Sequence, residues 1–139
     1  YDSIKEELKV LKQLEHPNLI WLHEIIDDPS IGGDIHLVTD YCSNGSLGDM
    51  LDSINAEYKE HNQQCRKESR YNDTLAKGVE IWQARFFFVD MLKAMHYCHR
   101  IVGVVHKDIK PDNIVIGHSR EAILIDFGLA ALWDHEEQD

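Results

Sequence analysis

Two short stretches of this chain bring together side chains that can do chemistry. Residues 105–113 carry Asp108, Lys110 and Asn113, and residues 125–128 carry an Asp-Phe-Gly triplet that begins at Asp126. Carboxylate and amide oxygens are the hard ligands that Mg²⁺ takes in phosphate-handling sites, and a carboxylate can also orient a hydroxyl nucleophile. The two stretches therefore indicate phosphoryl transfer, with Asp108 as the base and Asn113 and Asp126 as metal ligands.

The spacing of the two stretches predicts that they meet in space. Asn113 and Asp126 are 13 residues apart, which leaves room for a strand, a turn and a return strand. Residues 114–116 and 122–125 are strand-like, and residues 117–120 have the composition of a turn. We therefore expect a hairpin that brings Asn113 and Asp126 to one end. The alternative is that these polar residues are ordinary turn and cap residues, and the combined spacing argues against it.

The elements that must position these residues begin with an amphipathic helix. Apolar residues step at helical spacing through residues 3–15, and Pro17 in the stretch 16–18 ends the helix. Residues 19–26 and 34–41 then read as two strands, so we expect a helix followed by a hairpin.

The middle of the chain is expected to hold a short helix and an insertion. Ser46 and Asp49 have the spacing of an N-terminal cap, which predicts a short helix through Met50 and Leu51. The segment from about 55 to 77 has few large apolar residues and many charges, so we expect a solvated insertion that is partly helical or disordered.

A second long helix is expected from Trp82 to Met95. It is apolar around most of its circumference, which predicts burial on several sides, and the run of three phenylalanines at 86–88 is expected in the core.

Composition excludes some classes of protein. The 139 residues are 43% hydrophobic and carry a formal net charge of −11, so we expect a soluble domain that binds neither nucleic acid nor membrane. No apolar run approaches the roughly 20 residues of a bilayer span. The three cysteines lack C-x-x-C spacing and read as reduced thiols of a cytoplasmic protein. A zinc site at residues 96–99 is a weak alternative to ordinary helix packing, because Cys98 points away from the face that His96 and His99 share.

This sequence resembles the eukaryotic protein kinase family. The resemblance rests on the pattern H-x-D-x-x-x-x-N from His106 to Asn113 and on the Asp-Phe-Gly triplet, and it covers nearly the whole chain except the insertion. It implies an α+β, protein-kinase-like two-lobe fold, with residues 1–39 in the small lobe, 40–42 as the hinge and 43–139 in the large lobe.

The resemblance also implies ATP and Mg²⁺ as cofactors and a protein substrate. Asp108 then orients the substrate hydroxyl and accepts its proton, Lys110 neutralises the γ-phosphate, and Asn113 and Asp126 hold the metal. Lys110, two residues after Asp108, resembles the serine/threonine version of the loop.

Further residues match the nucleotide site of the family. Thr39 matches the gatekeeper, Asp40 to Cys42 match the hinge whose backbone binds adenine, and Val115 matches the residue beneath the adenine ring. Glu7 matches the glutamate that pairs with a strand lysine. Periodicity alone would make Val115 strand core and Glu7 a solvated helix residue, so both alternatives stay open.

The family's regulatory hydrophobic stack matches Leu11, Leu22, His106 and Phe127, for which simple core packing is an alternative that does not conflict. Lys107 stands where the family usually has an arginine that clamps a phosphorylated activation loop, so we expect weaker dependence on that phosphorylation.

Within the family, residues 6–19, 27–29 and 83–86 most resemble the calcium/calmodulin-dependent kinase kinase branch, which would make calmodulin a partner of the full-length protein.

Several family motifs do not occur in these residues: the G-x-G-x-x-G loop, the strand lysine and the A-P-E triplet. We therefore expect a middle piece of a catalytic domain, truncated at both ends, that alone neither folds cooperatively nor transfers phosphate. A pseudokinase that serves as an allosteric or scaffolding module is the competing function. A third alternative is an unrelated protein in which Asp108 and Asp126 lie far apart.

Overall fold

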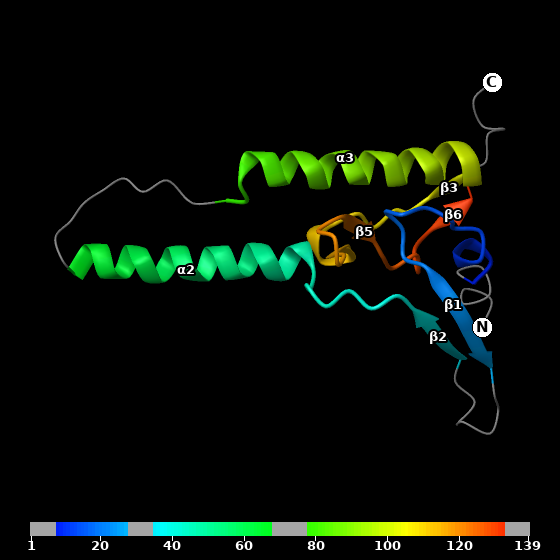
Figure 1. Ribbon diagram of the computed structural model, residues 1–139, viewed down its shortest axis with the longest axis horizontal. Coiled ribbons are helices and arrows are strands. Elements are labelled where there is room, and N and C mark those ends of the chain that lie inside the picture. Colours follow the sequence, from blue (N-terminus) through cyan, green and yellow to red (C-terminus); the bar gives the residue numbers. More distant parts are fainter. Residues whose placement is uncertain (1–7, 28–34, 68–77, 133–139) are drawn as a thin grey trace.

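The computed structural model describes residues 8–27, 35–67 and 78–132 (Figure 1). Residues 8–11 are helical, and the antiparallel strands β1 (Leu22–Asp27) and β2 (Ile35–Thr39) follow. The expected hairpin is confirmed, and so is the part of the expected helix at residues 8–11, but the helix ends at Leu11 and not at residue 15. The strand expected from residue 19 begins later, because the Ile20 amide donates to the Leu124 carbonyl at 3.0 Å and so leaves the β1–β2 pairing.

Helix α2 (Leu47–Lys67) is much longer than expected. The Ser46 hydroxyl accepts from the Asp49 amide at 3.0 Å, and Asp49 Oδ2 accepts from the Ser46 amide at 2.9 Å, so the predicted cap is confirmed. The prediction that the helix is short was wrong. Most residues after Asn55 are good helix formers, namely alanine, glutamate, lysine, glutamine and arginine, and no glycine or proline interrupts them before Lys67. The rest of the expected insertion, residues 68–77, lies outside the described residues.

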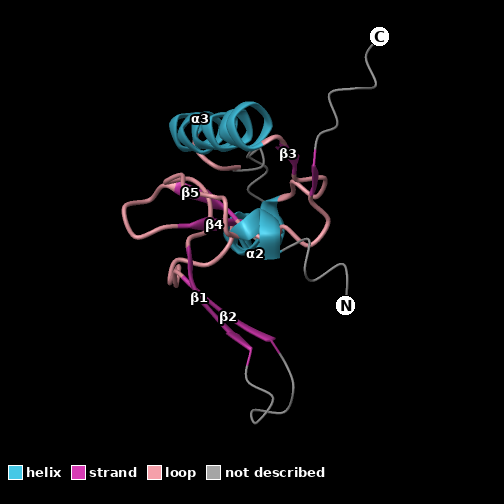
Figure 2. Ribbon diagram, turned by 90° about the vertical axis from the view of Figure 1, so that its right-hand side faces the viewer, coloured by secondary structure: helices cyan, strands magenta, loops and turns pink. Residues whose placement is uncertain are grey.

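Helix α3 (Ile81–Tyr97) runs antiparallel to α2 and lies beside it in both ribbon views (Figures 1 and 2). It continues into a π-helical turn, η2 (Cys98–Val102), which ends at Gly103 with a φ of 72°. This left-handed geometry is readily available to glycine.

The expectation that α3 is buried on several sides was wrong. Of the three phenylalanines, Phe87 is 8% exposed, whereas Phe86 and Phe88 are 63% and 65% exposed. Among the described residues, α3 packs mainly through one face against β5. The residues buried along α3 are Phe87, Met91 and Ala94.

The remaining strands form two small antiparallel pairs (Figure 2). Strand β3 (Val104–Val105) pairs with β6 (Ala131–Leu132), and β4 (Ile114–Ile116) pairs with β5 (Ala122–Leu124). A 3₁₀ turn, η3 (Pro111–Asn113), leads into β4. The predicted hairpin with its turn at 117–120 is therefore confirmed.

The core of the described residues lies where residues 8–20, α3 and the β4–β5 hairpin meet. Ala94, Val104, Ala122 and Leu124 are fully buried there. The mixture of helices and strands agrees with the expected α+β class. No helix in the described ranges is long and apolar enough to cross a bilayer.

Candidate active site

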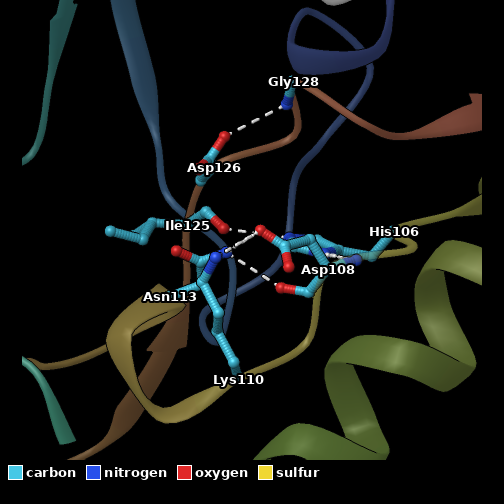
Figure 3. Close-up of polar contacts among 7 residues, drawn as sticks. All are labelled: His106, Asp108, Lys110, Asn113, Ile125, Asp126 and Gly128. Carbon is cyan, nitrogen blue, oxygen red and sulfur yellow. Dashed lines mark hydrogen bonds and ion pairs between the residues drawn. The ribbon is translucent and has the colours of Figure 1, made fainter. Parts of the chain in front are cut away.

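Asp108 is the centre of a polar cluster in the loop between β3 and η3 (Figure 3). Its Oδ2 accepts hydrogen bonds from Lys110 Nζ and from Asn113 Nδ2, both at 2.8 Å, and its backbone carbonyl accepts from Asn113 Nδ2 at 2.8 Å. The 3₁₀ turn makes this possible, because it folds the chain back so that the Asn113 amide donates to the Lys110 carbonyl. The structure thus brings together three of the four predicted catalytic residues.

The cluster fixes the charge of Asp108. The hydrogen bond from Lys110 has the largest effect and holds the pKa of Asp108 below its usual range. Burial opposes this lowering, and the bond from Asn113 adds to it. In turn, Asp108 raises the pKa of Lys110. Both groups are therefore ionised at neutral pH. Within the described residues Oδ1 of Asp108 accepts no hydrogen bond, so this oxygen is available to an incoming hydroxyl.

Asp126 reaches the same site from the end of the β4–β5 hairpin. The Ile125 amide donates to the Asn113 carbonyl at 2.9 Å, so the hairpin places the two predicted metal ligands at one end, as the spacing predicts. The Asp126 charge also acts on Lys110, whose pKa it raises. The alternative in which Asp108 and Asp126 lie far apart is wrong. The two residues do not hydrogen bond to each other in the described part of the chain.

Two residues of the site hold backbone geometry that is unusual outside glycine. Lys107 and Asp126 have φ angles of 67° and 63°. Such left-handed backbone in non-glycine residues is strained and collects at functional sites, where surrounding contacts hold it. At Asp126, Oδ1 accepts from the Gly128 amide at 3.2 Å, which fixes the turn.

His106 joins the two halves of the site. It is 2% exposed, its Nδ1 accepts from the Asp108 amide at 3.2 Å, and its Nε2 donates to the Ile125 carbonyl at 2.9 Å. This pair of bonds requires the neutral ring. The ring also packs edge-on against Phe127, with 4.7 Å between centroids. Sequence analysis assigned His106 to the hydrophobic stack and missed this bridge, because its partners lie on separate segments.

A cleft of ≈ 280 Å³ opens beside Asp126. Four of the five predicted nucleotide-site residues line this cleft: Thr39, Asp40, Cys42 and Val115. Glu7 lies outside the described residues. Val115 is half-buried on β4 and faces the cleft, although its contacts with the core also agree with the alternative of strand packing.

The side of the cleft formed by Asp40 is tied to β1 and to the residue before it. The Asp40 amide donates to the Trp21 carbonyl at 3.2 Å, and Asp40 Oδ1 lies 2.7 Å from His23 Nε2. Burial, with the nearby Asp40 and Glu121 charges, raises the pKa of the Cys42 thiol. Cys42 is therefore a neutral thiol at the edge of the cleft.

The residues of the regulatory stack share one apolar region. Leu11, His106 and Phe127 are buried, and Leu22 is half-buried against the core. Leu11 and Phe127 also line the cleft. These contacts fit both the stack and simple core packing.

Asn18 is a positioning residue that sequence analysis missed. It is 5% exposed, its Nδ2 donates to the Ala122 carbonyl at 2.9 Å, and its own carbonyl accepts from the Leu124 amide at 2.9 Å. The His16 ring supports it by accepting from the Asn18 amide at 3.1 Å. Asn18 therefore fixes β5, the strand that ends two residues before Asp126. The sequence signalled only the end of a helix, because the partners are about a hundred positions away.

The donor set at the site fits a magnesium ion. The side-chain Nδ2 of Asn113 donates to Asp108, which leaves the side-chain Oδ1 of Asn113 for a metal. Asp126 Oδ2 accepts no hydrogen bond within the described residues. Mg²⁺ is usually held by one or two such protein oxygens together with phosphate oxygens and water. No group of three or more His, Cys, Asp or Glu in the described ranges could hold a metal by itself.

Comparison with known proteins gives the family. The model of the protein kinase domain matches residues 1–139, the whole chain. The chain belongs to the protein kinase family. The expected α+β kinase fold class is thereby confirmed.

Several curated kinases are similar to this kinase chain. It is 30% identical to CBL-interacting protein kinase 1 of Oryza sativa over 99% of the chain and 24% of that protein. It is 31% identical to NUAK family SNF1-like kinase 2 of Rattus norvegicus, and 30% identical to serine/threonine-protein kinase ssp1 of Schizosaccharomyces pombe. These matches cover 94% and 93% of the chain and 16% of each relative. The chain thus spans about a quarter or less of these relatives. Their names do not test the resemblance to the calcium/calmodulin-dependent kinase kinase branch, which stays a prediction, as do the lobe boundaries at residues 39 and 42.

Proposed function

We propose that this chain is part of a serine/threonine protein kinase that transfers the γ-phosphate of ATP to a protein hydroxyl. The contact cluster of Asp108, Lys110 and Asn113 carries this proposal. His106 bonds it to the segment that bears Asp126, so that four polar side chains act at one place. The family match and the names of the relatives support it.

Asp108 is the base of the proposed reaction. Its Oδ2 is held by Lys110 and Asn113, so Oδ1 accepts the hydrogen bond of the substrate hydroxyl and orients the oxygen for attack. The lowered pKa keeps the carboxylate ionised, which suits orientation of the hydroxyl and late acceptance of its proton.

The other three residues of the site, Lys110, Asn113 and Asp126, offset the negative charge of the phosphates. Lys110 presents an ammonium group beside Asp108 and within electrostatic reach of Asp126; here it neutralises the transferred phosphoryl group. Asn113 and Asp126 supply the carboxamide and carboxylate oxygens for Mg²⁺. When bound, Mg²⁺ and ATP supply the phosphoryl group and the cation that offsets its charge. Thr39, Asp40, Cys42 and Val115 form the adenine end of the cleft.

Lys107 affects how strongly the rate is expected to depend on phosphorylation of the activation loop. It retains the positive charge of the usual arginine without the planar fork that grips a phosphate in two places. We expect the rate to depend weakly on activation-loop phosphorylation. Equal turnover of phosphorylated and dephosphorylated full-length protein supports this idea, and a large difference contradicts it. A cytoplasmic location and calmodulin binding belong to the same proposal.

The alternative proposal is a pseudokinase that binds partners without transferring phosphate. The chain retains Asp108, Asn113 and Asp126, and this retention supports the active enzyme over the pseudokinase. The presence or absence of a strand lysine in the full-length protein discriminates between the two, because an active kinase needs this lysine to pair with a glutamate such as Glu7.

Asp108→Asn in the full-length protein tests the catalytic role. The amide keeps the shape of the side chain but cannot take the proton, so turnover should fall about a hundredfold or more. Asp52→Asn, at an exposed position on α2, is the matched control and should retain wild-type turnover. Phosphate transfer from labelled ATP to a generic serine-containing protein measures both variants. Unchanged turnover of Asp108→Asn removes Asp108 from this role.

A further inference from the structure

A short polar contact joins strand β1 to the connection between β2 and α2. His23 Nε2 lies 2.7 Å from Asp40 Oδ1. A carboxylate oxygen only accepts hydrogen bonds, so the ring donates through Nε2 in this contact. Both side chains are half-exposed, and exposed pairs of this kind add little to the stability of a fold. The contact therefore acts mainly on the orientation of Asp40.

His23 is the extra residue of a β-bulge in β1. Leu22 pairs with Thr39 of β2. The next pair joins Glu24 to Val38, the residue before Thr39, which leaves His23 without a partner in the ladder. A bulge bends its strand and re-aims a side chain, and bulges are common next to active sites. The bulge thus explains why the His23 ring reaches a residue beyond the end of β2.

The backbone of Asp40 is held at the same time as its side chain. Its amide donates to the Trp21 carbonyl at 3.2 Å, and its carbonyl accepts from the Thr39 hydroxyl at 3.4 Å. Asp40 lines the cleft of ≈ 280 Å³ beside Asp126, in the stretch whose backbone the proposed function assigns to adenine. The orientation of this one residue therefore decides how its peptide groups face a base in the cleft.

We propose that His23 is a positioning residue for the purine base of the nucleotide. His23 is not among the residues that line the cleft, so it acts through Asp40. The hydrogen bond holds Asp40 in one conformation before the base arrives, which removes part of the ordering cost of binding. This role of His23 rests on the proposed function, because it requires that the cleft binds a nucleotide. It makes affinity for the base depend on a side chain outside the cleft.

Calorimetry on the full-length protein tests this role with two ligands, ATP with Mg²⁺ and adenosine, which lacks the phosphates. In His23→Ala the affinity for each ligand should fall about three- to fivefold, which is the range of an exposed charged pair. A loss of affinity for ATP alone would place the effect at the phosphates and overturns the proposed role.

The wild-type protein separates this proposal from the proposed function. If it binds neither ligand, the proposed function fails and the role of His23 fails with it. If it binds both and His23→Ala binds them equally well, only the role of His23 is overturned.

Further variants separate positioning from packing. His23→Gln should bind ATP within about twofold of the wild type, because its side-chain amide can donate to Asp40 from the place of Nε2. Asp40→Ala removes the acceptor, so adding His23→Ala to it should cause no further loss. His36→Ala, at an exposed histidine of β2, is the matched control and should bind as the wild type does. Equal losses in His23→Ala and His23→Gln, or additive losses in the double variant, overturn the role.

Steady-state kinetics and thermal melts give two further measurements on His23→Ala. The KM for ATP should rise while kcat stays near its wild-type value, because the residues around Asp108 are unchanged. The melting temperature should shift by no more than about 3 °C, since the pair is exposed. A fall in kcat as large as the rise in KM, or a larger fall in melting temperature, would mean that His23 supports the fold as a whole, which overturns its proposed role.

Discussion

The catalytic cluster and the cavity between α2, α3 and the turn of the β4–β5 hairpin show opposite uses of side chains. In the cluster, Asp108 receives hydrogen bonds from two side chains on the same loop, and the buried His106 ties that loop to the segment after β5. At the cavity, Trp82 and Phe86 are largely exposed, and Glu121 Oε2 has no hydrogen-bond partner among the described residues. Asp108 is thus held in place by neighbouring side chains, whereas the described residues leave the two rings uncovered. The comparison teaches that the two regions can be tested independently.

The largest expected difference in the free energy of unfolding is between substitutions at two neighbouring phenylalanines of α3. Phe87→Ala should lower the free energy of unfolding by about 3–5 kcal/mol, because it leaves a cavity in the core. Phe86→Ala should change it by only about 0.5 kcal/mol, because that ring is exposed. Denaturant unfolding of the full-length protein measures both. Similar losses in the two variants would mean that another part of the protein covers Phe86.

Cys98 and Cys42 also differ in burial, and they should differ in reactivity for that reason. Burial raises the pKa of Cys98 to about 11, so its thiolate fraction at neutral pH is about a hundredfold below that of an ordinary thiol. Cys42 lines the nucleotide cleft and is only half-buried. We expect iodoacetamide to modify Cys42 first in a Cys65→Ser background, as read by mass spectrometry. Added Mg²⁺ and ATP should slow that reaction. Faster modification of Cys98 would contradict the packing described here.

The bridge from the catalytic loop to the segment after β5 depends on His106. His106→Ala removes the partners of the Asp108 amide and the Ile125 carbonyl, and should lower the free energy of unfolding by about 2 kcal/mol. Turnover should also fall, because Asp108 and Asp126 lose their common support. The exposed His118 on the hairpin turn offers the control, His118→Ala, which should be neutral. Wild-type stability in His106→Ala would show that the bridge does not hold the site together.

The smallest effect concerns the ion pair within the cluster. Lys110→Ala removes the main cause of the lowered Asp108 pKa, so this pKa should rise toward its ordinary value. A lowered carboxyl pKa adds stability above the unfolded-state value, and that stability is lost as the pH falls through the folded value. Without Lys110 the folded and unfolded pKa values of Asp108 lie closer together, so Asp108 adds less stability at neutral pH and less of it is lost in acid. Carboxyl carbon NMR during titration reports the shift, and an unchanged Asp108 pKa would exclude Lys110 as its cause.

The parts of the site that could be predicted are those set by nearby residues. Asp108, Lys110 and Asn113 lie within one loop, and a 3₁₀ turn beginning at Pro111 necessarily folds them together. The hairpin register follows from strand-like residues on both sides of a turn, so the approach of Asp126 could also be predicted. The length of α2 could not, because polar residues that favour solvation also favour a helix.

The sequence by itself determined the chemistry: a carboxylate, an amine, a carboxamide and a second carboxylate at spacings that short-range geometry converts into one site. Only the tertiary structure decided which face of α3 is buried, since Phe86, Phe87 and Phe88 are the same residue type and differ only in what lies opposite them. It also decided that Asn18 and His106 fix β5 and the segment after it. These bonds join distant segments, and hydrophobic periodicity carries no information about a partner that far along the chain.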